Sequence, residues 1–181
     1  MPNLNRFTTL ALGFYSVMLS VALGAGIWRG HVGLWIRWEN AWRDLAIGVG
    51  GGLVIVAISR LAALIPSYRS LLDAFSGLLA GLSWLDVFLC ALSSSVGEEL
   101  LFRGVLQPEL GLPWATLLFG LLHIGGERRY LWWTAFALVV GALFGLMASL
   151  RGSLVAPIAA HFVVNLLNMR YLSRRGVAET A

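Results

Sequence analysis

The sequence predicts an all-α fold, a multi-pass transmembrane helical bundle, and three observations support this prediction. The 181-residue chain is 59% hydrophobic and only 12% charged, whereas a soluble domain carries about 25% charged residues. Its mean hydropathy is +0.80, and apolar runs recur near the length of about 20 residues that crosses a bilayer core as a helix. All thirteen basic residues are arginines, and most of them flank these runs, as is typical of membrane proteins.

The first two spans are separated by an aromatic loop. Residues 7–28 predict a retained membrane anchor, because this run exceeds the 7–15 apolar residues of a signal peptide, the rival interpretation. Residues 29–44 predict an interfacial loop or a short surface helix, and residues 45–65 predict the second span. Tryptophans gather around the loop, and we expect them at the level of the lipid headgroups: Trp28, Trp35, Trp38 and Trp42.

The later segments are more varied. Residues 67–83 mix charged and apolar side chains, which favours an amphipathic surface helix. Further apolar segments follow at 84–106, 113–124, 130–150 and 153–169. Pro113 suits the first turn of the short segment that it opens. The prediction is therefore about six membrane segments plus a possible surface amphipathic helix.

We expect one integral membrane domain with three parts. Residues 1–83 form an N-terminal anchor with interfacial segments, residues 84–169 form the core, and residues 170–181 form a polar tail. Six segments place both termini on the same side of the membrane. More of the loop arginines fall on that side, so the positive-inside rule predicts cytoplasmic termini.

Several functional classes are disfavoured by composition. The net charge of +4 comes without a compact basic face interleaved with aromatic residues, so we expect no nucleic-acid partner. The single cysteine, Cys90, excludes a disulfide framework and a CxxC metal site. The glycine-rich stretch from Gly48 to Gly52 lacks the Lys-Ser/Thr of a phosphate loop, and its GxxxG spacing favours close helix packing instead.

Polar side chains inside apolar segments carry the functional information, because a charge at the bilayer centre costs about 2.5–3.5 kcal/mol on insertion scales. These residues are Glu98, Glu99, Arg103, His123, His161 and Asn165. Glu99 and Arg103 are four residues apart, which predicts an ion pair on one helical face. Glu98 points away from that pair and stays available for chemistry. Phe119 and His123, and likewise His161 and Asn165, share a face by the same spacing.

Together these residues can form a hydrolytic centre. Desolvation makes Glu98 a competent base for water, and His123 can help to orient that water. His161 and Asn165 can donate hydrogen bonds to an oxyanion. A catalytic zinc held by Glu98, His123 and His161 is the alternative, although the sequence lacks an HExxH motif.

Three motifs in order resemble those of the CPBP family, the abortive-infection or CAAX-processing type of intramembrane endopeptidase. They are Glu98-Glu99-x-x-x-Arg103, Phe119-x-x-x-His123 and His161-x-x-x-Asn165. The resemblance covers about residues 84–169. It implies a helical bundle with a polar cavity that hydrolyses peptide bonds near the membrane.

The resemblance also implies roles for individual residues. It assigns water activation to Glu98 with His123, and the oxyanion hole to His161 and Asn165. Glu99, Arg103 and Phe119 would support them. A metal-free, glutamate-type mechanism is the favoured one, with zinc as the alternative.

The resemblance leads to a functional hypothesis. We expect an endopeptidase of a bacterial cytoplasmic membrane that acts on a membrane-associated protein or peptide, with C-terminal sorting signals as one candidate substrate. A non-catalytic membrane partner or bacteriocin-immunity protein is the main alternative. A transporter is disfavoured because no inverted repeat is evident.

Overall fold

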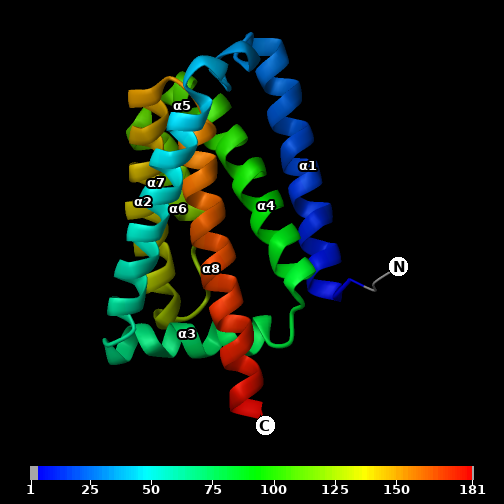
Figure 1. Cartoon of the computed structure of the whole chain (residues 1–181), viewed down its shortest axis with the longest axis vertical. Helices are drawn as coiled ribbons and strands as arrows, with labels where there is room; N and C mark the ends of the chain where they lie inside the picture. Colours follow the sequence, from blue (N-terminus) through cyan, green and yellow to red (C-terminus); the bar gives the residue numbers. More distant parts are fainter. Residues whose placement is uncertain (1–3, 181) are drawn as a thin grey trace.

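The computed structural model describes residues 4–180, which form helices and turns without a β-strand. Helices α1, α2, α4, α7 and α8 run alongside one another, and α3 lies across one end of the bundle (Figure 1). The elements are α1 (Arg6–Arg29), 3-10 turns at Val32–Leu34 and Trp38–Asn40, α2 (Ala41–Ala62), α3 (Pro66–Leu79), α4 (Trp84–Leu101), a π-helical turn (Phe102–Leu106), α5 (Gln107–Leu110), α6 (Leu112–Leu121), a 3-10 turn at Arg128–Tyr130, α7 (Leu131–Arg151) and α8 (Val155–Thr180).

Local signals set the ends of the helices. The side chain of Asn5 accepts a hydrogen bond from the Phe7 N–H at the start of α1. Gly30 ends that helix at φ 73°, a left-handed conformation that glycine adopts without a steric penalty. Ser83 and Asp86 form a reciprocal capping box that starts α4 and satisfies its first N–H groups.

Three helical segments are long and apolar enough to cross a membrane: Arg6–Arg29, Trp38–Ala62 and Arg128–Arg151. A fourth is possible if α3 and the helix that continues from α4 count as one bent span, since they meet at 114°. Helix α6 has only 10 residues. The predicted count of about six membrane segments is therefore not confirmed among the described residues, because α6 is short and α8 is not among the candidate spans.

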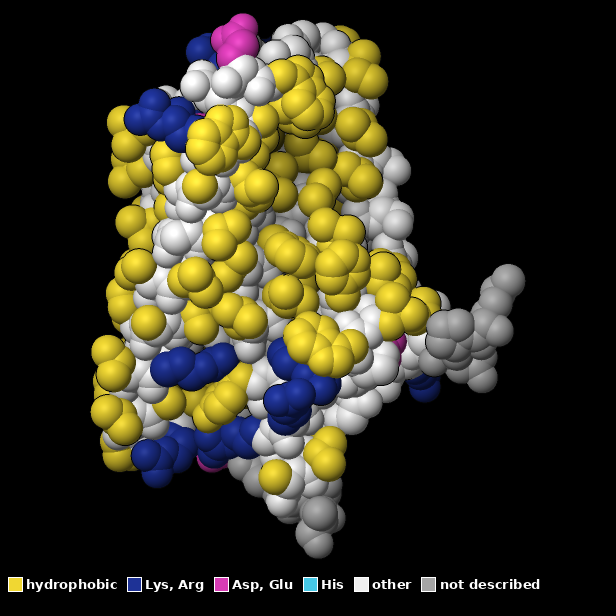
Figure 2. Space-filling view, in the orientation of Figure 1, with side chains coloured by type: hydrophobic (Ala, Val, Ile, Leu, Met, Phe, Trp, Pro, Cys, Tyr) yellow, Lys and Arg dark blue, Asp and Glu magenta, His cyan; other side chains and the backbone are white. Residues whose placement is uncertain are grey.

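The outer surface fits a bilayer. Figure 2 shows apolar side chains over the middle of the bundle, with arginine and acidic side chains gathered toward its two ends. Leu10, Val17 and Leu150 are among the large apolar residues that face outward. The chain is thus an integral membrane protein, and both of its ends lie toward the α3 end of the bundle (Figure 1).

The aromatic loop differs in one residue from the prediction. Trp28, Trp38 and Trp42 are exposed as expected, but Trp35 is only 6% exposed. Its indole N–H donates to the Gly104 carbonyl at 3.1 Å, and its ring fills the space beside Gly26. Trp35 is buried because it finds both an acceptor and a glycine surface to pack on.

Helix α8 is the centre of the bundle and contacts α2, α3, α4 and α7. Close approach to α2 depends on Gly48 and Gly52, since a Cβ at Gly48 would lie 2.3 Å from the Ala156 carbonyl oxygen. Residues 170–180 continue α8 instead of forming a separate tail. Ser173 secures this extension through a hydrogen bond to the Leu82 carbonyl.

Candidate active site

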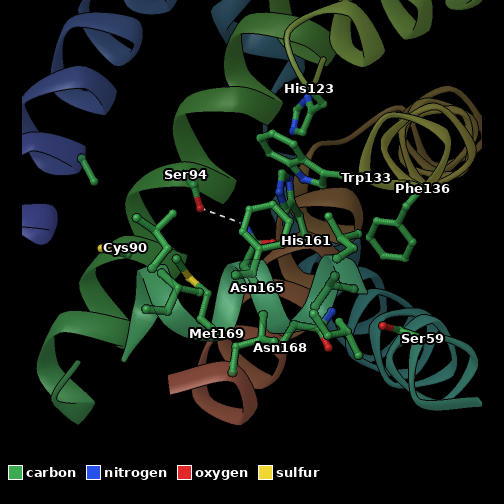
Figure 3. Close-up of a pocket in the computed structure, with 18 of the residues that line it drawn as sticks. Ser59, Cys90, Ser94, His123, Trp133, Phe136, His161, Asn165, Asn168 and Met169 are labelled. Carbon is green, nitrogen blue, oxygen red and sulfur yellow. Dashed lines mark hydrogen bonds between the residues drawn. The ribbon is translucent and has the colours of Figure 1, made fainter. Parts of the chain in front are cut away.

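One cavity of about 600 Å³ brings together polar residues that are far apart in the sequence. Glu98, His123, His161 and Asn165 all line it, together with apolar side chains from α1, α3 and α8. Figure 3 shows His123 above Trp133, with His161 and Asn165 nearby. Glu99, Arg103 and Phe119 are buried behind these residues and do not line the cavity.

The two oxygens of Glu98 have different environments. Oε1 accepts a hydrogen bond from the Tyr15 hydroxyl at 2.9 Å. Oε2 is buried and has no hydrogen-bond partner among residues 4–180. Only one oxygen of Glu98 therefore lacks a hydrogen bond, whereas the sequence predicted simply that Glu98 stays available for chemistry.

Glu99 is completely buried and holds two partners. Its Oε2 lies 3.3 Å from Arg103 Nε, which confirms the predicted ion pair, and its Oε1 lies 2.8 Å from His161 Nδ1. Arg103 also donates to the Gly141 carbonyl at 2.9 Å and lies over the ring of Phe119, 4.3 Å from its centroid. Glu99 thus fixes an arginine and a histidine at once.

His161 lies between the two glutamates. A carboxylate oxygen only accepts, so the contact with Glu99 places a proton on Nδ1. Nε2 lies 3.9 Å from Glu98 Oε2, and the ring stacks on Phe144 at 5.1 Å between centroids. The imidazole is consequently fixed in orientation, with Nε2 toward the cavity residue Glu98.

His123 follows the last turn of α6, and its tautomer can be assigned from one contact. Nδ1 lies 2.7 Å from the Phe119 carbonyl oxygen, which can only accept a hydrogen bond. Nδ1 therefore carries the proton and Nε2 keeps its lone pair. The ring also packs against Trp133 at 5.0 Å between centroids, so His123 is held as a hydrogen-bond acceptor.

Asn165 donates one amide hydrogen to Ser94 Oγ at 2.9 Å (Figure 3). An amide has two N–H groups, so one remains for another acceptor. Ser94 is itself buried in α4, so the contact joins α4 to α8. Cys90 is buried in the same helix.

Two contributors to the site were missed from the sequence. Tyr15 lies in α1, 83 residues before its partner Glu98, and Trp133 lies in α7 beside His123. Both are aromatic residues in apolar segments, where they look like ordinary lipid-facing or core residues. The unusual signal was the phenol hydroxyl of Tyr15 in the middle of an apolar run, because a buried hydroxyl needs a partner.

The donor groups are not arranged as a metal site. Within the described residues, no group of three or more His, Cys, Asp or Glu side chains is placed to hold a metal ion. His31 belongs to the opposite end of the bundle, partly buried, with Nε2 3.3 Å from Glu109 Oε1.

The apolar helices and the buried acid–imidazole cavity define an integral membrane protein with a polar cavity between its helices. Residues 80–167 match the family model described as Type II CAAX prenyl endopeptidase Rce1-like. This part of the chain is therefore similar to the CPBP family of CAAX-type proteases. The matched region contains all three motifs but excludes Tyr15.

One curated relative is the "Uncharacterized protein YpbD" of Bacillus subtilis (strain 168), which is 45% identical over 71 residues. That alignment covers 38% of this chain and 35% of the relative, so the chain spans about a third of that protein's length. No solved structure matches the chain significantly.

Proposed function

We propose that the protein is an intramembrane endopeptidase in which Glu98 activates water. One observation carries the proposal: Glu98 Oε2 is a buried carboxylate oxygen without a partner, in a cavity that His123, His161 and Asn165 also line. A carboxylate oxygen without a hydrogen bond, beside an imidazole, can accept a proton from water.

The proposed reaction uses each group once. Glu98 Oε2 takes a proton from water while the water oxygen bonds to the substrate's carbonyl carbon and the carbonyl π electrons move onto oxygen. His123 Nε2, which has a lone pair, accepts the second hydrogen of the same water as a hydrogen bond. The C–N bond then breaks, and the proton passes from Glu98 to the leaving nitrogen.

The oxyanion needs donors in this scheme. The second N–H of Asn165 can supply one. His161 can supply another from Nε2 when it carries both protons, and the carboxylates of Glu98 and Glu99 flank its ring to stabilise that charge. Glu99, Arg103 and Phe119 act as positioning residues in this proposal, because they hold His161 and the helices around it.

The cavity also suggests the kind of substrate. Its walls on α1 and α3 are mostly apolar, with Phe7, Phe14, Leu71 and Phe75 among them. Such walls fit the hydrophobic part of a membrane-associated protein or peptide. C-terminal sorting signals, which combine a cleavage site with an apolar segment, are the first substrate class to test.

The experiment is Glu98→Gln in purified protein reconstituted in vesicles, assayed with internally quenched peptides that carry a hydrophobic C-terminal segment. Loss of a general base should lower kcat about 100-fold or more, with normal folding. Glu127→Gln is the matched control, because Glu127 is exposed and pairs with Arg129 away from the cavity. Unchanged cleavage in Glu98→Gln would remove Glu98 from its role.

We further propose that the reaction needs no metal ion, because among the described residues no group of three or more His, Cys, Asp or Glu side chains is placed to hold one. Elemental analysis of active protein should find no stoichiometric zinc. Zinc that is lost together with activity would support the alternative set of Glu98, His123 and His161. A folded protein that cleaves none of the peptides and retains a membrane partner would favour the non-catalytic alternative.

A further inference from the structure

A second cavity of about 420 Å³ lies where the loop after α1 meets the α5–α6 turn and the α7–α8 turn. It shares no lining residue with the proposed active site. Its volume falls within the range of about 300–1,000 Å³ that is usual for small-molecule sites. The proposed peptidase reaction makes no use of it.

Buried polar atoms without partners line this second cavity. Arg103 Nη1, His31 Nδ1 and Gln107 Oε1 each lack a hydrogen-bond partner among the described residues. The Arg103 side chain is only 2% exposed, and its other nitrogens are used by Glu99 and Gly141. Buried polar atoms are normally satisfied, so Nη1 indicates an acceptor that occupies the cavity.

The unpaired charge at this cavity is positive. Arg37 lines the cavity, and the structure gives its guanidinium no hydrogen bond or ion pair within residues 4–180. Two nearby acidic groups are paired, since Glu109 contacts Arg29 and Asp44 contacts Arg151 at 2.6 Å. A third, Glu39, is exposed and does not line the cavity. An anion is therefore the complementary ligand.

The start of α8 adds to this positive potential. Ser153 and Leu154 line the cavity immediately before the 26-residue helix begins at Val155. The N-terminus of a helix is the positive end of its dipole. The dipole is the main contribution here, because the Val155 N–H already donates to Ser153 Oγ and Pro157 has no N–H. Arg37 is held beside this terminus, since a Cβ at Gly152 would lie 3.2 Å from its Cζ.

The end of the bundle that holds the second cavity also carries the exposed tryptophans Trp28, Trp38 and Trp42. Exposed tryptophans of membrane proteins concentrate at the level of the lipid headgroups. We propose that the second cavity binds a phosphate group, held by Arg37, the N-terminus of α8 and Arg103 Nη1. An anionic phospholipid headgroup and free phosphate share this chemistry, and the test below distinguishes them.

The test uses purified, delipidated full-length protein as wild type, Arg37→Gln and Arg43→Gln. Arg43 is the matched control, because it is an exposed arginine near Arg37 in sequence that does not line the cavity. Retention of phosphatidylglycerol is measured by native mass spectrometry, and the thermal shift with inorganic phosphate is measured separately. We expect Arg37→Gln to bind about tenfold more weakly or worse, and Arg43→Gln to bind like wild type.

Each outcome decides a point. Retention of phosphatidylglycerol that depends on Arg37 supports a lipid headgroup, and an Arg37-dependent shift with inorganic phosphate alone supports free phosphate. Equal weakening in both variants would reduce the effect to general surface charge and overturn the proposal. Absence of binding in wild type would also overturn it, leaving a water-filled cavity. These readouts are independent of peptidase activity.

Discussion

At the scale of residues, the two glutamates of the site differ in their partners. Glu99 lies against Arg103 through Oε2 and against His161 through Oε1. Glu98 accepts from Tyr15 through Oε1, and its Oε2 lies 3.9 Å from His161 Nε2. The difference follows from adjacent positions on one helix, which point about 100° apart. Two identical side chains at adjacent positions, Glu98 and Glu99, therefore have different environments.

Substitution of Tyr15 tests whether the reactivity of Glu98 Oε2 depends on the hydrogen bond that Tyr15 donates to Oε1. We expect Tyr15→Phe to lower kcat about tenfold, since a hydrogen bond to a charged group contributes about 1.5–3 kcal/mol, while KM changes little. Tyr171→Phe is the control, because the structure gives the Tyr171 ring a contact with Arg60 and its hydroxyl no hydrogen bond within the described residues. A larger rise in KM than fall in kcat would instead place Tyr15 in substrate binding.

Glu99 should matter for folding as well as activity. Glu99→Gln leaves Arg103 buried without its charge partner, which typically costs about 3–5 kcal/mol. We expect a clear loss of thermal stability in detergent, measured by thermal unfolding. Glu109→Gln, which removes a more exposed partner of Arg29, should change stability little. Full stability of Glu99→Gln would contradict the role of Glu99 as an anchor.

At the scale of elements, glycines decide how closely α2 and α8 pack. A Cβ at Gly48 would collide with the Ala156 carbonyl, while a Cβ at Gly50 would meet nothing within 4 Å. We expect Gly48→Ala to lower stability by about 1–3 kcal/mol through overpacking. Gly50→Ala should be neutral or slightly stabilising, because alanine favours helix more than glycine does. Equal effects of both variants would argue against this helix contact.

Apolar runs predicted the helices well, because the backbone N–H and C=O groups of a spanning segment must form their hydrogen bonds within that segment. The run at residues 7–28 lies within Arg6–Arg29, and the run at 130–150 nearly coincides with Leu131–Arg151. The predicted short helix at residues 113–124 also exists, as Leu112–Leu121.

Other features depend on neighbours that the sequence does not reveal. The π-helical turn Phe102–Leu106 follows the glutamates, with Gly104 inside it and Pro108 just after it. Neither residue is a signal specific to a π-helical turn. The spacing between Glu99 and Arg103 predicted their pair, because both belong to one helical stretch. The contacts from His161 to Glu99 and from Tyr15 to Glu98 join distant helices, so only the packed bundle defines them.

At the scale of the whole molecule, the two cavities are linked by one side chain. Arg103 contacts Glu99 behind the proposed active site and also lines the second cavity. The band of apolar side chains in Figure 2 lies between the two ends of the bundle, where the charged side chains gather. Orientation across the membrane therefore decides which cavity is nearer to which compartment.

We predict that both ends of the chain face the cytoplasm, because arginines are concentrated at the α3 end. Cysteines placed at Arg174 and Arg43 test this in intact bacterial cells, with Cys90 buried and giving little background. An impermeant maleimide should label Arg43→Cys in intact cells and Arg174→Cys only after lysis. The reverse pattern would invert the topology.

The central claim is that Glu98 and His123 act on one water molecule. The most direct measurement is kcat/KM for Glu98→Gln, His123→Asn and the double variant. Residues that act as a unit are strongly non-additive, so the double variant should lose no more activity than the worse single variant. Losses that multiply in the double variant would show that the two residues act independently and would contradict the account.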